Sequence, residues 1–319
     1  MINSVRNTVL SILNKNNYGY ISPADFNLFA KQAQMDIFED YFYEYNRQIN
    51  KENARYGVNS LLSSGTGYAN ITKSIEEAID IFSVSKQLHH SVSNKFFLPS
   101  AVTTGDDYYM INKALVYETF RTDGSVTTVS TNQLVDAAAT FTATVAVGDI
   151  VVNTVTYEYA EITNIVSDTV LDLDSDIFTV LSDTYSIFLA VQNEAEKVSH
   201  SKITMLNSTP FTAPSAIFPV YTEENGLMTV FPKTLTEAGR VLAQYIRYPK
   251  EPKWTFRTLT NGEPVFDSTQ PDYQDFELPL DDEVDLVNRI LQYAGMSIRE
   301  IQAVQFGQAE EQKDNQTKA

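Results

Sequence analysis

The residues able to carry chemistry are few and scattered along the chain. Cysteine is absent, and the three histidines are His89, His90 and His200. Without thiols the chain forms no disulfide, thiolate nucleophile, iron–sulfur cluster or cysteine-based zinc site. His89 and His90 are sequence neighbours, which a helix points in different directions, and no H-E-x-x-H motif accompanies them. The histidines therefore do not predict a zinc site.

Residues 14–25, NKNNYGYISPAD, have the spacing of an EF-hand loop. Oxygen donors stand at its first and third positions, Gly19 at the sixth, and the carboxylate of Asp25 at the twelfth. Calcium requires several carboxylates, but this loop offers Asp25 alone and places Tyr18 at its fifth position. We expect an ordinary connection between two helices, the second beginning at Ser22-Pro23.

Three acidic residues, Asp172, Asp174 and Asp176, alternate along a predicted strand. Alternation puts their carboxylates on one face, where they repel one another unless a cation or water intervenes. Calcium remains an alternative there, although Ile177 stands where an EF-hand has glycine and no glutamate closes the loop. A solvated strand edge is the preferred interpretation, because edge acids also discourage unwanted strand pairing.

Other catalytic patterns are weak. Gly65-Thr66-Gly67 follows no apolar strand and lacks the Lys-Ser/Thr pair of a phosphate-binding loop, and no G-x-S-x-G occurs. Paired carboxylates that cleave glycosides meet only in three dimensions, so the sequence leaves them open. We expect a protein that is not an enzyme and uses no cofactor or metal.

Charge and composition limit the remaining classes. The 41 acidic and 23 basic side chains give a net charge of −18, which disfavours a broad surface for nucleic-acid phosphates. The 319 residues, 43% of them apolar, predict two domains at roughly 150 residues each. No apolar run approaches the ~18 residues of a membrane span, and the first residues lack a signal-peptide pattern. We expect neither export nor contact with a membrane.

Helical patterns lie toward both ends of the chain. Short helices are predicted over 4–14 and about 75–82, and a long one from Ser22 to about Ile49. The long helix carries an apolar stripe of Phe26, Ala30, Ala33, Ile37, Tyr41 and Tyr45. Phe38, Phe42 and Tyr43 extend its apolar surface, which favours packing between helices or subunits. A last helix is predicted after Pro279, with Gly295 as a break.

Strand patterns fill the middle of the chain. We expect residues 107–120 and 125–130 to form a hairpin around Asp123-Gly124, a second hairpin around Asn225-Gly226, and a strand over 240–248. Residues 132–192 are rich in threonine, valine and aspartate and predict a small inserted barrel or sandwich. Its strands are expected at 140–147, 150–155, 159–166, 170–173 and 185–191.

The predicted fold class is therefore α+β. A helical parent domain with β-hairpins is built from residues 1–131 and 193–306. The small all-β domain, residues 132–192, is inserted into it. Residues 307–319 form a polar C-terminal tail without apolar periodicity.

Four segments of the parent domain carry a resemblance to a known family. They are 3–42 (NSVRNTVLSI…FEDYF), 217–232 (IFPVYTEENGLMTVFP), 244–254 (QYIRYPKEPKW) and 273–302 (YQDFELPLDD…SIREIQ). Together they resemble the ring or adaptor proteins of the head-to-tail connector in short-tailed bacteriophages, most closely those of crAss-like phages. The inserted segment 145–178 also resembles small β domains of phage virion proteins, but less specifically.

The resemblance implies a structural virion protein, assembled in the bacterial host cytoplasm. It implies a homo-oligomeric, dodecameric ring between the portal protein and the adjacent tail ring or tail proteins. Genomic DNA would pass through the channel without sequence-specific binding. The acidic charge agrees with this, because a negative channel repels DNA phosphates instead of holding them.

Large aromatics supply the candidate contact residues. Tyr41, Tyr45 and Trp254 are candidate interface anchors, with burial inside the subunit as the alternative. Phe306, just before the polar tail, is a candidate for docking on a partner. A rival function is a receptor- or carbohydrate-binding virion component with the inserted β domain as its head. Exposed aromatics there would favour it, among Phe141, Tyr157, Tyr159, Phe178, Tyr185 and Phe188.

Overall fold

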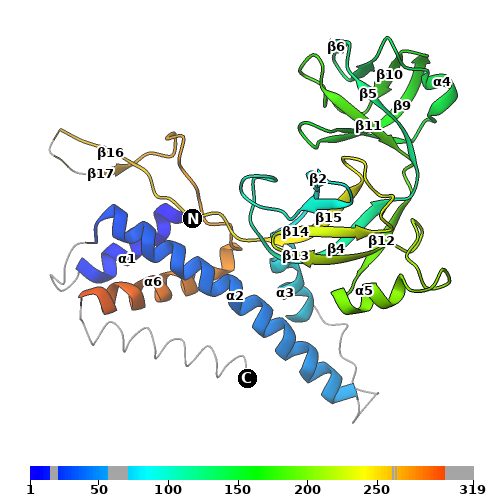
Figure 1. The fold of residues 1–319 in the computed structure, drawn as a ribbon. Coiled ribbons are helices and arrows are strands. Elements are labelled where there is room, and N and C mark those ends of the chain that lie inside the picture. Colours follow the sequence, from blue (N-terminus) through cyan, green and yellow to red (C-terminus); the bar gives the residue numbers. More distant parts are fainter. Residues whose placement is uncertain (15–20, 57–70, 261, 263, 299–319) are drawn as a thin grey trace. The chain divides into compact units, whose positions relative to one another are not determined.

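The computed structural model describes residues 1–14, 21–56, 71–260, 262 and 264–298. It is a mixed α+β protein, as predicted (Figure 1). The chain divides into two compact units: unit 1 is Met1–Phe82 with Pro249–Ala319, and unit 2 is Ser83–Tyr248. Residues 15–20 of the EF-hand-like segment, Gly65-Thr66-Gly67, Phe306 and the tail 307–319 lie outside the described residues.

Unit 1 is built around three helices, α1 (Ile2–Asn14), α2 (Pro23–Tyr56) and α6 (Glu283–Ile298). Helix α6 packs against both α1 and α2 (Figure 1). The apolar stripe predicted for α2 faces this core, with Phe26, Ala30, Ala33 and Ile37 all buried. Helix α3 (Ile71–Asp80) also packs on α2. A short 3-10 turn, η1 (Leu280–Asp282), leads into α6.

Side chains fix where the two N-terminal helices begin. The Ser22 hydroxyl accepts a hydrogen bond from the Asp25 amide (3.1 Å) and donates one to the Asp25 carboxylate (2.6 Å), so the predicted cap of α2 is confirmed. Helix α1 begins earlier than expected. The Ile2 amide donates to Asp275 (2.7 Å), which supplies the cap from the opposite end of the chain.

Unit 2 contains an eight-stranded sheet in the order β1-β15-β4-β12-β13-β14-β3-β2. Its strands are β1 (Ser83–Gln87), β2 (His90–Val92), β3 (Lys95–Phe97), β4 (Tyr108–Tyr117), β12 (Gln192–Lys197), β13 (Val220–Glu224), β14 (Leu227–Phe231) and β15 (Val241–Arg247). The predicted hairpin at Asn225-Gly226 is confirmed as β13–β14, and both turn residues have positive φ, 51° and 74°. The short helix α5 (His200–Leu206) follows β12.

A seven-stranded sheet in the order β5-β11-β8-β9-β10-β7-β6 completes unit 2. Its strands are β5 (Phe120–Ser125), β6 (Thr128–Ser130), β7 (Gln133–Val135), β8 (Ile150–Asn153), β9 (Tyr159–Ser167), β10 (Val170–Leu173) and β11 (Thr184–Phe188). The inserted β domain is predicted to begin at residue 132. The sheet begins earlier in the sequence, because its strands β5 and β6 both precede that residue. The four later strands lie within or close to their predicted ranges.

Three local predictions are wrong. Asp123-Gly124 is no turn: both residues lie inside β5, which pairs with β11 instead of β4. Residues 140–147 contain the short helix α4 (Phe141–Thr144) and no strand, and Phe141 is buried in the core with 0% exposure. Gly295 does not break α6, which continues to Ile298.

Candidate functional site

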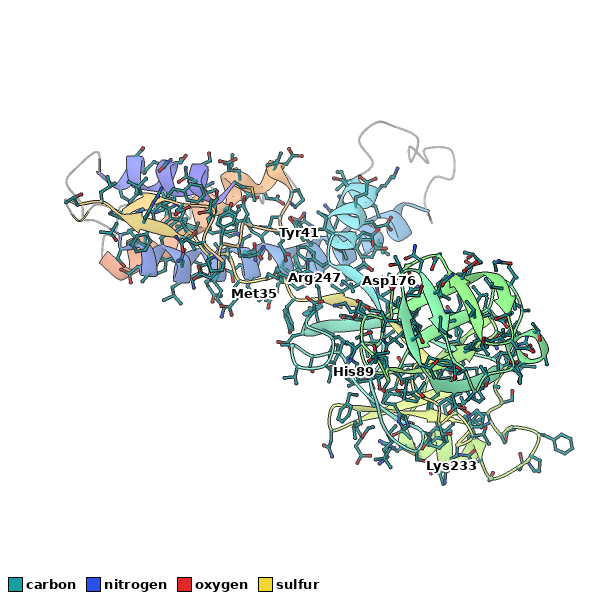
Figure 2. All side chains as sticks on the ribbon, turned by 90° about the horizontal axis from the view of Figure 1, so that it is seen from above. Met35, Tyr41, His89, Asp176, Lys233 and Arg247 are labelled. Carbon is teal, nitrogen blue, oxygen red and sulfur yellow. The ribbon has the colours of Figure 1, made fainter. Side chains whose placement is uncertain are left out.

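The aromatic residues singled out in the helices are engaged within unit 1 (Figure 2 labels Tyr41). Tyr41 is 8% exposed and donates a hydrogen bond to Asp282, just before α6. Burial and this bond raise the pKa of Tyr41 well above its usual value. Tyr45 is partly exposed and donates to Glu76 of α3 (2.9 Å). Both tyrosines thus join α2 to its neighbours.

Trp254 lies inside unit 1 with 2% exposure. Its indole N–H donates to Asn3 (3.1 Å), its backbone N–H donates to Asn27 (2.8 Å), and the Arg6 guanidinium lies 3.8 Å from the ring centroid. The residue therefore holds α1 and α2 to the connecting segment that precedes the β16 (Phe256–Thr258) and β17 (Pro264–Phe266) hairpin. Its structural role is internal packing, and a role between copies stays a prediction.

The three aspartates do not share one face of a strand. Strand β10 ends at Leu173, so only Asp172 belongs to it. Asp172 accepts from Gln133 (2.8 Å) and Asn164 (3.1 Å), whereas Asp174 accepts from the Glu161 amide (2.9 Å). Within the described ranges no group of three or more His, Cys, Asp or Glu side chains could hold a metal ion. The carboxylates tie strands and loops together.

The surface of unit 2 carries an apolar region that the sequence reading missed. We call residues 200–218 (HSKITMLNSTPFTAPSAIF) the apolar segment. It begins with α5, whose Ile203 is buried, and leaves four large side chains in solvent. Their exposed fractions are Met205 68%, Phe211 100%, Ile217 54% and Phe218 76%. Large apolar side chains this exposed are candidates for contact with a partner.

Hydrogen bonds hold the apolar segment in shape. The Ser199 hydroxyl caps α5 by accepting from the Lys202 amide (3.3 Å). The Thr212 hydroxyl donates a hydrogen bond to the Leu206 carbonyl (2.8 Å), and the Phe218 amide donates one to the Ser215 hydroxyl (3.2 Å). The exposed rings are thus presented by a loop with its own framework. The signal available in the sequence was a stretch that combines large apolar residues with no acidic one, in a chain of charge −18.

Unit 1 has a contrasting surface at the start of α6. We call residues 280–285 (LDDEVD) the acidic helix start. Leu280 and Val284 stand one helical turn apart and are 76% and 67% exposed. Asp281, Asp282, Glu283 and Asp285 surround them. Negative charge is favourable here for the helix itself, because it lies at the N-terminal end of the dipole.

Comparison with known proteins adds no identification. The chain matches no protein-family model, and a search of curated proteins finds no significant match. Among the described residues, no helix is both long enough and apolar enough to cross a membrane.

Proposed function

We propose that this protein is a structural virion component that forms a closed ring in the portal-to-tail connector of a short-tailed bacteriophage. Twelve copies would surround a channel for genomic DNA and offer a platform to the portal and the neighbouring tail proteins. The observation that carries the proposal is the apolar segment, in which Phe211 is 100% and Phe218 76% exposed. Exposed phenylalanine side chains such as these are removed from water only by contact with a partner surface.

Charge narrows the choice of partner surface. Each copy carries −18, so two copies repel one another unless a region of low negative charge lies between them. The apolar segment contains no acidic residue of its own. Its Lys202 pairs with Glu196 (2.7 Å) and its His200 lies 3.9 Å from Glu224, so the two basic side chains offset neighbouring negative charge. The acidic helix start offers apolar side chains, Leu280 and Val284, within a negative field. Both surfaces can therefore bury apolar side chains, and only one of them contains acidic residues.

The contact that we propose joins the apolar segment of one copy to the acidic helix start of the next. Two different surfaces of one chain make a heterologous interface, and repetition of such an interface closes into a ring when its rotation allows. The negative charge of the remaining surface keeps DNA phosphates from binding tightly in the channel. Phe306 and residues 307–319 remain predicted to dock on the portal or an adjacent ring.

Paired variants test this arrangement. Phe211→Asp with Phe218→Asp disables one surface, and Leu280→Asp with Val284→Asp disables the other. Each double variant should remain folded but sediment as a monomer in analytical ultracentrifugation. The control Val102→Asp, at a position that is 94% exposed and belongs to neither surface, should still form rings. In an equal mixture, the intact acidic helix start of the first double variant can bind the intact apolar segment of the second. The mixture should therefore form dimers of one copy of each. Rings from either double variant alone would refute the proposed contact.

A further inference from the structure

A hollow of about 500 Å³ opens in unit 2 and takes no part in the proposed ring contact. One side comes from the end of β1 and from the turn at Thr103-Thr104, and the other from the β8–β9 turn and the loop after β10. His89 and Asp176, both labelled in Figure 2, lie in these two sides. Pockets of ~300–1,000 Å³ are the usual size for small-molecule ligands.

Two aromatic side chains meet in the wall of the hollow. The rings of His89 and Tyr157 are stacked, with centroids 3.9 Å apart and planes inclined by 14°. The Tyr157 hydroxyl accepts a hydrogen bond from the His90 amide (2.9 Å), which joins the two sides of the hollow. Burial lowers the pKa of His89, so the stacked imidazole is neutral at pH 7. Tyr159, 48% exposed, adds a third ring.

The β8–β9 turn is set in place by a buried side chain. Asn153 is 0% exposed, and its side-chain oxygen accepts from the Val155 (2.8 Å) and Thr156 (3.3 Å) amides. Its side-chain nitrogen donates to the Ile177 carbonyl (2.9 Å), in the loop after β10. Tyr157 itself has a φ of 60°, a conformation that non-glycine residues seldom adopt. Contacts within the protein therefore fix the shape of this wall.

The polar groups of the hollow suit an uncharged ligand with many hydroxyls. Glu158 and Asp176 are exposed carboxylates that accept hydrogen bonds, and nearby serine and threonine hydroxyls can both donate and accept. Lys86 is the one lysine or arginine among the described lining residues, and it is held by Asp106 (2.7 Å) and the Thr104 carbonyl (2.5 Å). Phosphates and other anions thus lack a free cation to bind.

We propose that this hollow is a binding site for a neutral saccharide. The apolar C–H face of a sugar ring packs against the aromatic wall formed by Tyr157 and Tyr159. The sugar hydroxyls donate to the carboxylates of Glu158 and Asp176. None of the residues that line the hollow belongs to either surface of the proposed ring contact, so one protein could form the ring and also bind a saccharide.

The test uses the full chain and four probes, the methyl glycosides of glucose, galactose, mannose and N-acetylglucosamine. Titration calorimetry and saturation-transfer NMR should find at least one with a Kd of about 1 mM or tighter. Glu158→Gln with Asp176→Asn should weaken that binding about tenfold, and Tyr159→Ala should do the same. Glu224→Gln and Tyr43→Ala are matched controls on exposed side chains outside the hollow, and should leave binding unchanged.

Thermal unfolding accompanies each variant, so that a loss of binding is separated from a loss of fold. The proposal is overturned if none of the four glycosides binds, or if binding survives in both hollow variants with the fold intact. Tetramethylammonium serves as the competing probe, because carboxylates beside aromatic rings also suit a cation. If it binds in the hollow and no glycoside does, the ligand class is a cation and the saccharide assignment is wrong. None of these results depends on whether rings form.

Discussion

The hydroxyl of Tyr185 donates a hydrogen bond of 2.7 Å to the carboxylate of Asp136 in the interior of the seven-stranded sheet. The two side chains are 1% and 5% exposed. Gly124 lies directly against this pair: a Cβ placed there would come within 2.5 Å of the tyrosine oxygen and 2.6 Å of the carboxylate. Glycine is therefore required inside strand β5 by packing, not by a turn.

Gly124→Ala should lower the free energy of unfolding of unit 2 by about 1–3 kcal/mol, because the added methyl overpacks a buried polar pair. Urea unfolding followed by circular dichroism measures this. Ser125→Ala, at the exposed neighbouring position, should change it by less than about 0.5 kcal/mol. In a Tyr185→Phe background the alanine should cost less, since the hydroxyl that it meets is gone. Equal costs in both backgrounds would contradict the steric account.

Trp254→Ala should be among the most damaging single changes in unit 1. It removes a ring that is 2% exposed and the stacking partner of Phe256 and Phe266, at centroid distances of 5.6 and 6.0 Å. Large aromatic-to-alanine changes in cores cost about 3–5 kcal/mol. Phe256→Ala, at a ring that is 41% exposed, should cost clearly less. Denaturant unfolding monitored by circular dichroism compares them, and similar costs would show that Trp254 is no core residue.

Alkaline pH should weaken the contact between α6 and α2. Burial and a hydrogen bond to Asp36 raise the pKa of Tyr293 to about 12. An unfolded tyrosine titrates near pH 10, so the stabilisation is complete below about pH 10 and is lost as the pH rises through about 12. Tyr293→Phe should therefore destabilise the protein at neutral pH, by about 1 kcal/mol, and progressively less above pH ~10.

Thermal unfolding of wild type and Tyr293→Phe across this range supplies the measurement. Tyr43→Phe is the matched control, because Tyr43 is on α2, the helix that carries Asp36, and its ring is 69% exposed. Its effect should be small and independent of pH. A Tyr293→Phe penalty that grows with rising pH would contradict the sign of the shift.

Elements specified by local sequence were predicted well. The cap at Ser22 and the stripe from Phe26 to Ile37 define α2 through contacts within a few residues, and Asn225-Gly226 supplies the positive φ of its turn. Asp123-Gly124 carries the same turn signal but lies in a strand. What distinguishes it is the approach of Tyr185, some sixty residues away, which no local pattern reveals.

Surface and interior were harder to separate. Tyr41 and Trp254 have the residue types of interface anchors, but their partners, Asp282 and Asn3, come from the opposite end of the chain. Phe211 and Phe218 have ordinary apolar side chains, and only the three-dimensional structure shows that they are 100% and 76% exposed. The wall of the hollow depends on the stacking of His89, just before β2, on Tyr157, in the β8–β9 turn. These two residues are far apart in the sequence.

Electron microscopy of the purified full-length chain tests the central claim most directly. Copies joined through the apolar segment and the acidic helix start should appear as closed rings, with twelve-fold symmetry in their averaged end views. Raising the salt concentration should favour them, because it screens the repulsion between copies that each carry −18. Single particles of one chain at every concentration and salt, or two-fold symmetric dimers alone, would contradict it.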